Sequence, residues 1–161
     1  AELVDFDIQE TYPAPATTPT LDAKSYAPAY ILNMRGAPPA QLSVAAYGYV
    51  GHLARQAMQH LAYENEIFVE LVIPTQLAPF AIEPILSSAQ RTGRLLAIEE
   101  GTGSMGWGAE IVSQTASILG SRLLTSQRLA ALDTPIPASG PLEAKTLPDT
   151  AAIIQTVKRM V

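Results

Sequence analysis

A glycine-rich stretch carries the most recognisable chemical pattern of this sequence. Gly101, Gly103 and Gly106 satisfy G-x-G-x-x-G between an apolar run and a helical pattern, where backbone N–H groups can bind a pyrophosphate at a helix N-terminus. A dinucleotide site also needs an acidic residue at the end of the next strand, but the stretch after the helix has no carboxylate before Asp133. Alternatively, the glycines permit a sharp turn in which Trp107 packs or faces a partner.

Two carboxylates, Glu99 and Glu100, end the apolar run immediately before that turn. Either can act as a general acid, a general base or a hydrogen-bond acceptor. Successive residues of a strand point to opposite faces, so the two are not expected to act as a close pair. The favoured interpretation is that one of them caps the next helix or accepts hydrogen bonds from the amides of the turn.

The two histidines, His52 and His60, fall on a single helical pattern. At the standard helical rise they are about 12 Å apart along the axis and about 80° apart around it, too far to share one metal ion. Gln56 stands where a second ligand would be required. His52 is kept as a candidate for the ligand edge or for an interface. No residue of the chain is predicted to be catalytic, to bind a cofactor or to ligate a metal.

Composition narrows the function classes further. The chain has 161 residues, no cysteine, 48% hydrophobic residues and a formal net charge of -5. The missing cysteines remove disulfide scaffolds and thiolate chemistry, and the acidic balance disfavours nucleic acid and anionic membrane surfaces as partners. No apolar run approaches the roughly 20 residues that a membrane helix needs. We expect a soluble protein of the cytoplasm, or of the mitochondrial matrix in a eukaryote.

Composition also divides the chain into two parts. Residues 1–40 are rich in proline and are predicted to be a linker or arm, extended over 1–28, with a first strand at 30–33 that the turn at 36–39 joins to the next strand as a hairpin. After residue 40, apolar runs alternate with helical patterns. Strands are predicted at 42–47, 67–73, 94–100 and within 121–129, and helices at 50–63, from Pro84 to a closing Gly93, over 111–119, and after an Asp149 cap.

This alternation predicts an α/β fold, a three-layer sandwich in which helices cover both faces of a mostly parallel sheet. Ligands of such sheets bind beyond the carboxyl ends of the strands. The segments to search are therefore residues 47–48, 73–74 and 99–101. They contain no self-sufficient set of catalytic groups, and no serine of the chain lies in G-x-S-x-G, which favours a module of a larger protein.

Three stretches resemble the C-terminal domain of the β subunit of thiamine-diphosphate-dependent 2-oxo acid dehydrogenases, the E1 component of multienzyme complexes. The first is TGRLLAIEEGTGSMGWGAEI at residues 92–111, and the second is LDTPIPASGPLEAKTLPDTAAIIQTVKRMV at residues 132–161. The third, VAAYGYVGHLARQA at 44–57 with LAPF at 77–80, is looser. The resemblance covers residues 41–161, which are interpreted as one transketolase C-terminal-like domain.

This resemblance implies a five-stranded sheet with one antiparallel strand. In the family, thiamine diphosphate and magnesium are bound by other domains, so no cofactor is expected in this chain and the isolated chain is expected to be inactive. The implied role is subunit assembly, as a homodimer or E1 heterotetramer, and docking of the subunit-binding domain of the E2 acyltransferase. Asp133, Glu143 and Asp149 are the acidic candidates for that docking surface.

A competing hypothesis follows from the residues alone. The chain would then be a stand-alone nucleotide-binding or small-molecule-binding α/β protein that uses the turn over residues 101–108. Under the first hypothesis, the choice of 2-oxo acid depends on domains outside this sequence.

Overall fold

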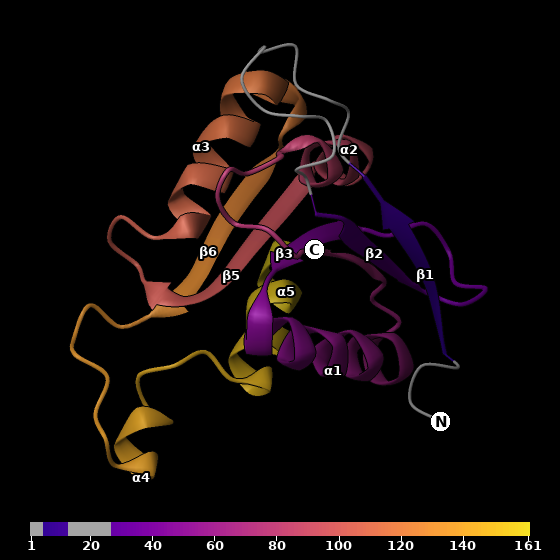
Figure 1. Cartoon of the computed structure of the whole chain (residues 1–161). Coiled ribbons are helices and arrows are strands. Elements are labelled where there is room, and N and C mark those ends of the chain that lie inside the picture. Colours follow the sequence, from indigo (N-terminus) through magenta and orange to yellow (C-terminus); the bar gives the residue numbers. More distant parts are fainter. Residues whose placement is uncertain (1–4, 13–26) are drawn as a thin grey trace.

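A computed structural model describes residues 5–12 and 27–161, which form an α/β sandwich (Figure 1). The predicted extended segment 1–28 therefore lies largely outside the described residues. The elements follow one another as β1 (Phe6–Thr11), β2 (Ala29–Met34), β3 (Leu42–Ala46), α1 (Gly48–Asn65), β4 (Val69–Pro74), α2 (Glu83–Thr92), β5 (Arg94–Thr102), α3 (Trp107–Leu119), the short 3-10 helix η2 (Gly120–Arg122), β6 (Thr125–Ala131), α4 (Gly140–Glu143) and α5 (Thr150–Met160).

The described strands form one sheet in the order β1-β2-β4-β3-β5-β6. β3 pairs in parallel with β4 and β5, and β5 pairs in parallel with β6. β2 pairs antiparallel with both β1 and β4, so it alone runs against the other strands. The predicted fold class, mostly parallel with one reversed strand, is confirmed, with a sixth strand beyond the expected five.

Two details of the N-terminal region differ from the expectation. The sixth strand is β1, which lies within the segment predicted to be an extended arm. β2 does not form a hairpin with β3, because β4 lies between them. The buried positions of β2 explain this placement: a strand with buried side chains on both faces, such as Ile31 and Leu32, is stable only where helices cover both sides of it.

The helices cover the two faces according to the order of the strands. The chain passes from β3 to β4 through α1 and returns across β3 to β5 through α2, and right-handed crossovers in opposite directions place these helices on opposite faces. α1 and α5 pack on one face, and α2 and α3 pack on the other (Figure 1). Central strand β3 is buried along its whole length.

Local sequence explains how the helices begin and end. Pro84 occupies the first turn of α2, and Gly93 closes that helix with φ 70°, a left-handed conformation that favours glycine. The side chain of Asp149 caps α5 by accepting a hydrogen bond from Ala152 N at 2.7 Å. The predicted helix boundaries are confirmed within a few residues at both sites.

Candidate functional site

The carboxyl ends of β3 and β5 form the candidate site. The helix after β3 leaves toward one face of the sheet and the helix after β5 leaves toward the other (Figure 1), so the strand order reverses between these two strands, where ligands of such sheets bind. Tyr47 follows β3 at this edge, and Glu99, Glu100 and the glycine turn follow along β5. The structure thus brings together the residues that the sequence analysis placed at a ligand edge.

Glu99 occupies the N-terminus of α3. Its side chain is 1% exposed, and its Oε1 accepts a hydrogen bond from Gly108 N at 2.9 Å. The residue at the cap position, Gly106, has no side chain to cap the helix, so the carboxylate of the preceding strand takes that role. The interpretation of this acidic pair as a helix cap is confirmed for Glu99.

The glycines of the turn make room for this carboxylate. A Cβ at Gly106 would lie 2.5 Å from Glu99 Oε2 and 2.5 Å from Thr102 O, and a Cβ at Gly108 would lie 2.8 Å from Glu99 Oε1. A Cβ at Gly101 would lie 3.0 Å from Glu99 Oε2. A carboxylate therefore occupies the position that a pyrophosphate takes in dinucleotide-binding proteins, and its negative charge opposes a second anion there.

Trp107 packs between two other aromatic rings beside this cap. The ring centroids of Tyr47 and Trp107 are 5.1 Å apart, and those of Phe80 and Trp107 are 5.7 Å apart, both in edge-to-face geometry. Burial raises the pKa of Tyr47, and the charges of Glu99 and Glu100 raise it further. Glu99 Oε2 and Trp107 Nε1 are both buried and have no hydrogen-bond partner among the described residues. These aromatic contacts hold Trp107, the first residue of α3, at the end of the glycine turn.

The tip of the turn is tied to the end of β6. Asp133 accepts hydrogen bonds from Ser104 N at 2.9 Å and from Ser104 Oγ at 2.7 Å, and Arg128 Nη1 donates to Gly103 O at 2.6 Å. The two Ser104 donors, together with the charge of Arg128, hold the pKa of Asp133 below its usual range. Met105 stands at the tip, fully exposed and with φ 57°.

Glu100 points to the face of the sheet opposite Glu99, as the strand alternation predicts. It lines a cavity of about 560 Å³ between the start of α1 and the segment around α4. Glu143 and Asp149 line the same cavity, so three carboxylates surround it. Its apolar lining is provided by Tyr49, Val50, Leu53, Ile136, Leu147 and Pro148.

The remaining predicted residues separate into two groups. Of the three docking candidates, Glu143 and Asp149 share the cavity with Glu100, whereas Asp133 holds the glycine turn. His52 is exposed on α1, stacks on Tyr49 with ring centroids 6.0 Å apart, and has Gln56 Nε2 3.1 Å from its Nε2. His52 therefore contacts a residue of the cavity without lining it.

A buried polar network was missed by the sequence analysis. Glu70, the second residue of β4, is 7% exposed and accepts hydrogen bonds from Asn33 Nδ2 at 3.1 Å and from the guanidinium of Arg91. The net effect of hydrogen bonds from Ser88, Asn33 and Arg91 is to lower the pKa of Glu70 against the opposing effect of burial. A glutamate inside the apolar run at residues 67–73 is the signal that could have located this network.

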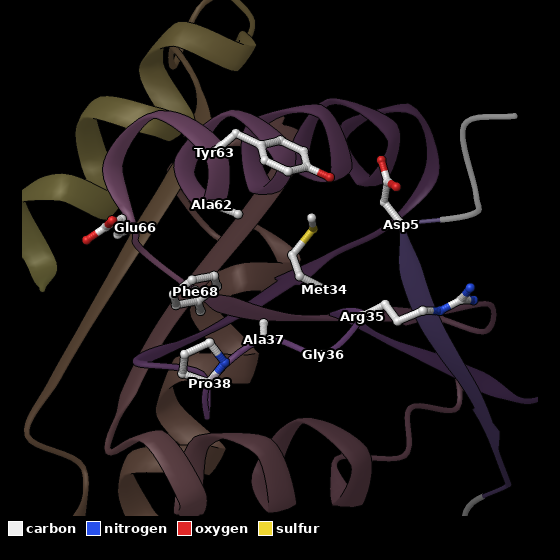
Figure 2. A pocket seen from close by; sticks show the side chains of 10 residues that line it. All are labelled: Asp5, Met34, Arg35, Gly36, Ala37, Pro38, Ala62, Tyr63, Glu66 and Phe68. Carbon is white, nitrogen blue, oxygen red and sulfur yellow. The ribbon is translucent and has the colours of Figure 1, made fainter.

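A second cavity of about 560 Å³ lies at the opposite edge of the sheet, between the end of α1 and the loop after β2. Figure 2 shows Tyr63 and Asp5 facing each other across it, while Arg35 extends away from Phe68. Arg35 Nε contacts Asp7 Oδ1 at 3.1 Å, and Arg35 Nη2 donates to Phe6 O. These contacts join β1 to the residue that follows β2.

Metal-ligating side chains are scattered over the described part of the molecule. Within residues 5–12 and 27–161, no group of three or more His, Cys, Asp or Glu side chains could hold a metal ion. No helix in this part of the chain is long and apolar enough to cross a membrane.

Comparisons with known proteins identify a family and several relatives of the chain. The family model described as "Transketolase, C-terminal domain" matches residues 35–153. The pyruvate dehydrogenase E1 component subunit beta of Leifsonia xyli is 35% identical over 62% of this chain and 29% of its own length. The beta subunit of acetoin:2,6-dichlorophenolindophenol oxidoreductase from Cupriavidus necator is 29% identical over 73% of this chain and 35% of its own length.

A third relative broadens the range of named substrates, and a solved structure supports the fold. The 3-methyl-2-oxobutanoate dehydrogenase subunit beta of Mycobacterium tuberculosis is 28% identical over 74% of this chain and 34% of its own length. A structure described as a split-gene transketolase, an inactive β4 tetramer, superposes with a TM-score of 0.62 at 23% identity over 77% of this chain and 40% of that chain. The chain thus spans about a third of the length of these curated relatives.

Proposed function

The chain belongs to the transketolase C-terminal domain family, and on that premise we propose that it is the C-terminal domain of the β subunit of a thiamine-diphosphate-dependent 2-oxo acid dehydrogenase. The observation that carries the proposal is the match to relatives named as beta subunits of pyruvate dehydrogenase E1 and of 3-methyl-2-oxobutanoate dehydrogenase. The intact enzyme would decarboxylate a 2-oxo acid and pass the acyl group to a lipoyl group of the acyltransferase. Thiamine diphosphate and magnesium would be bound by other domains of that enzyme.

Within this enzyme, the proposed role of the domain is assembly of the subunits and docking of the acyltransferase. The cavity lined by Glu100, Glu143 and Asp149 supports the docking role, because apolar walls surrounded by carboxylates suit a small basic binding domain. Exposed apolar side chains add to this surface: Tyr49 is 65% exposed and Ile136 is 51% exposed. The β subunit would form a homodimer or an E1 heterotetramer.

The docking role is tested by measuring the association rate and affinity between the assembled enzyme and the subunit-binding domain of its own acyltransferase. The variant Glu100→Gln/Glu143→Gln is expected to weaken binding roughly tenfold at low salt, mainly through slower association. The variant Glu64→Gln/Glu110→Gln removes the same charge elsewhere on the domain and is the matched control. Equal losses in both variants would show that only the net charge of the domain matters.

The assignment to a larger enzyme has its own test. The coding sequence upstream of Ala1 is expected to encode a pyrimidine-binding domain. Titration of the isolated chain with NAD and with thiamine diphosphate is expected to give no saturable binding of either, because Glu99 already occupies the N-terminus of α3. Saturable NAD binding at the glycine turn would instead favour the stand-alone nucleotide-binding function.

A further inference from the structure

The amino-terminal edge of the sheet, opposite the candidate site, carries two arginines that pair with no carboxylate of residues 5–12 and 27–161. Arg94 begins β5, and its Nη1 donates to Gln41 O at 3.3 Å. Arg122 precedes β6, and its guanidinium lies 3.4 Å from Leu119 O and 3.4 Å from Ile118 O. Among the described residues, every acceptor of these two side chains is a main-chain carbonyl.

Exposed apolar side chains accompany these arginines. Leu124 is 70% exposed and Ile118 is 49% exposed. Leu124 N donates to Gly93 O at 2.7 Å, which places this leucine next to the start of β5. Together Arg94, Ile118, Arg122 and Leu124 form what we call the arginine edge. Arginine is among the residue types enriched at protein interfaces, and here each guanidinium donates to main-chain carbonyls next to an exposed apolar side chain.

The backbone of the arginine edge is held in one geometry. The left-handed Gly93, with φ 70°, turns the chain from α2 into β5, and a Cβ placed there would lie 3.2 Å from Leu124 Cδ1 and 3.5 Å from Arg122 O. The register pair of Arg94 with Thr125 continues this contact into the sheet. An ordered surface loses little conformational entropy when a partner binds, which favours its use in recognition.

The two guanidinium groups determine what can bind there. They make the arginine edge locally positive, although the protein as a whole has a net charge of -5. From the two guanidinium charges and the exposed leucine beside them we infer that the arginine edge docks an acidic segment of a partner protein, with an apolar side chain of that segment packing on Leu124 and carboxylates pairing with Arg94 and Arg122. This surface is separate from the cavity around Glu100, which suits a partner of the opposite charge.

The test uses a fluorescein-labelled twelve-residue peptide of alternating glutamate and leucine as the probe, added to the chain while anisotropy is measured. Binding is expected to weaken when sodium chloride is raised, because exposed charge pairs are screened. Arg94→Gln/Arg122→Gln is expected to raise the dissociation constant roughly tenfold, on the basis of two exposed pairs. Leu124→Ser, at an exposed position, is expected to weaken binding by roughly threefold or more and to leave the fold intact.

The matched control is Lys158→Gln/Arg159→Gln, which removes two charges from α5 and is expected to leave the affinity for the peptide unchanged. The peptide is also expected to shift the amide resonances of residues 93–94 and 122–125. An equal loss of affinity in the control would overturn the proposal, as would shifts confined to other segments. Two further results would overturn it: competition by inorganic phosphate alone at the same affinity, or a self-association of the chain that Leu124→Ser abolishes.

Discussion

At the scale of single residues, the glycine turn illustrates how one motif can serve two different chemistries. Its glycines allow close approach of a negatively charged group to helix amides, which is also what a dinucleotide-binding turn requires. Here the negative group is the side chain of Glu99, nine residues before Gly108 in the chain. The sequence pattern shows that the glycines leave space beside the helix amides, but it does not show which group fills that space. A nucleotide-binding turn and a structural turn therefore have the same pattern, and only the geometry distinguishes them.

Gly106 provides the first test at this scale. Gly106→Ala is expected to destabilise the protein by about 1–3 kcal/mol, because the added Cβ would lie 2.5 Å from Thr102 O, a backbone atom that cannot move aside cheaply. Gly106 has φ -76°, so alanine adopts its backbone conformation without strain. Gly140→Ala is the control, since a Cβ there meets nothing within 4 Å. Chemical denaturation of both variants measures the difference, and equal stabilities would contradict the steric argument.

The contact between Asp133 and Ser104 makes a prediction about pH. Because the folded pKa of Asp133 is lowered, the charged carboxylate stabilises the folded state above the unfolded pKa, and that stability is lost as the pH falls through the folded pKa. A carboxyl titration followed by NMR is expected to give Asp133 a midpoint below 3.8. Ser104→Ala removes the hydroxyl donor and is expected to move that midpoint upward. A midpoint that stays the same in the variant would show that the hydroxyl contributes nothing.

At the scale of elements, the strongly patterned segments could be predicted from the sequence and the weakly patterned ones could not. β4 and β5 are nearly continuous apolar runs, and their positions follow from burial on both faces. β1 has one buried residue, Phe6, and four exposed ones, so its sequence resembles a polar linker. The neighbours of β2 were not predictable either, because strand pairing between distant segments depends on the whole sheet.

The Glu70 network tests how α2 is attached to the sheet. Arg91→Gln is expected to cost about 1–3 kcal/mol, since Glu70 keeps its hydrogen bond from Asn33 but loses its only ion-pair partner among the described residues. Arg35→Gln breaks an ion pair whose side chains are 58% and 63% exposed, and is expected to cost less than about 1 kcal/mol. Denaturation midpoints of the two variants provide the comparison. A larger loss for Arg35→Gln would show that the buried network is not the stronger attachment.

At the scale of the whole molecule, the position of β2 bears on where the folded unit begins in the sequence. The family match begins at residue 35, after β2, and the sequence predicts the domain from residue 41. In the structure β2 pairs with β4 along the register from Ala29 and Pro74 to Leu32 and Leu71. Both faces of β2 contribute buried side chains to the two cores of the sandwich. These contacts indicate that the folded unit begins before residue 41.

Truncation tests that boundary. A chain of residues 41–161 would leave β4 as an unpaired edge whose residues Val69, Leu71 and Val72 are each at most 3% exposed in the full chain. It is therefore expected to unfold at a lower denaturant concentration than the full chain and to aggregate. A chain of residues 27–161 keeps β2 and, of the described elements, loses β1, so it is expected to have intermediate stability, reduced by the loss of Phe6, which is 2% exposed. The contrary result would be cooperative unfolding of the 41–161 chain at the same denaturant midpoint as the full chain. The first forty residues would then be an arm outside the folded unit, and β2 would pair with the sheet without stabilising it.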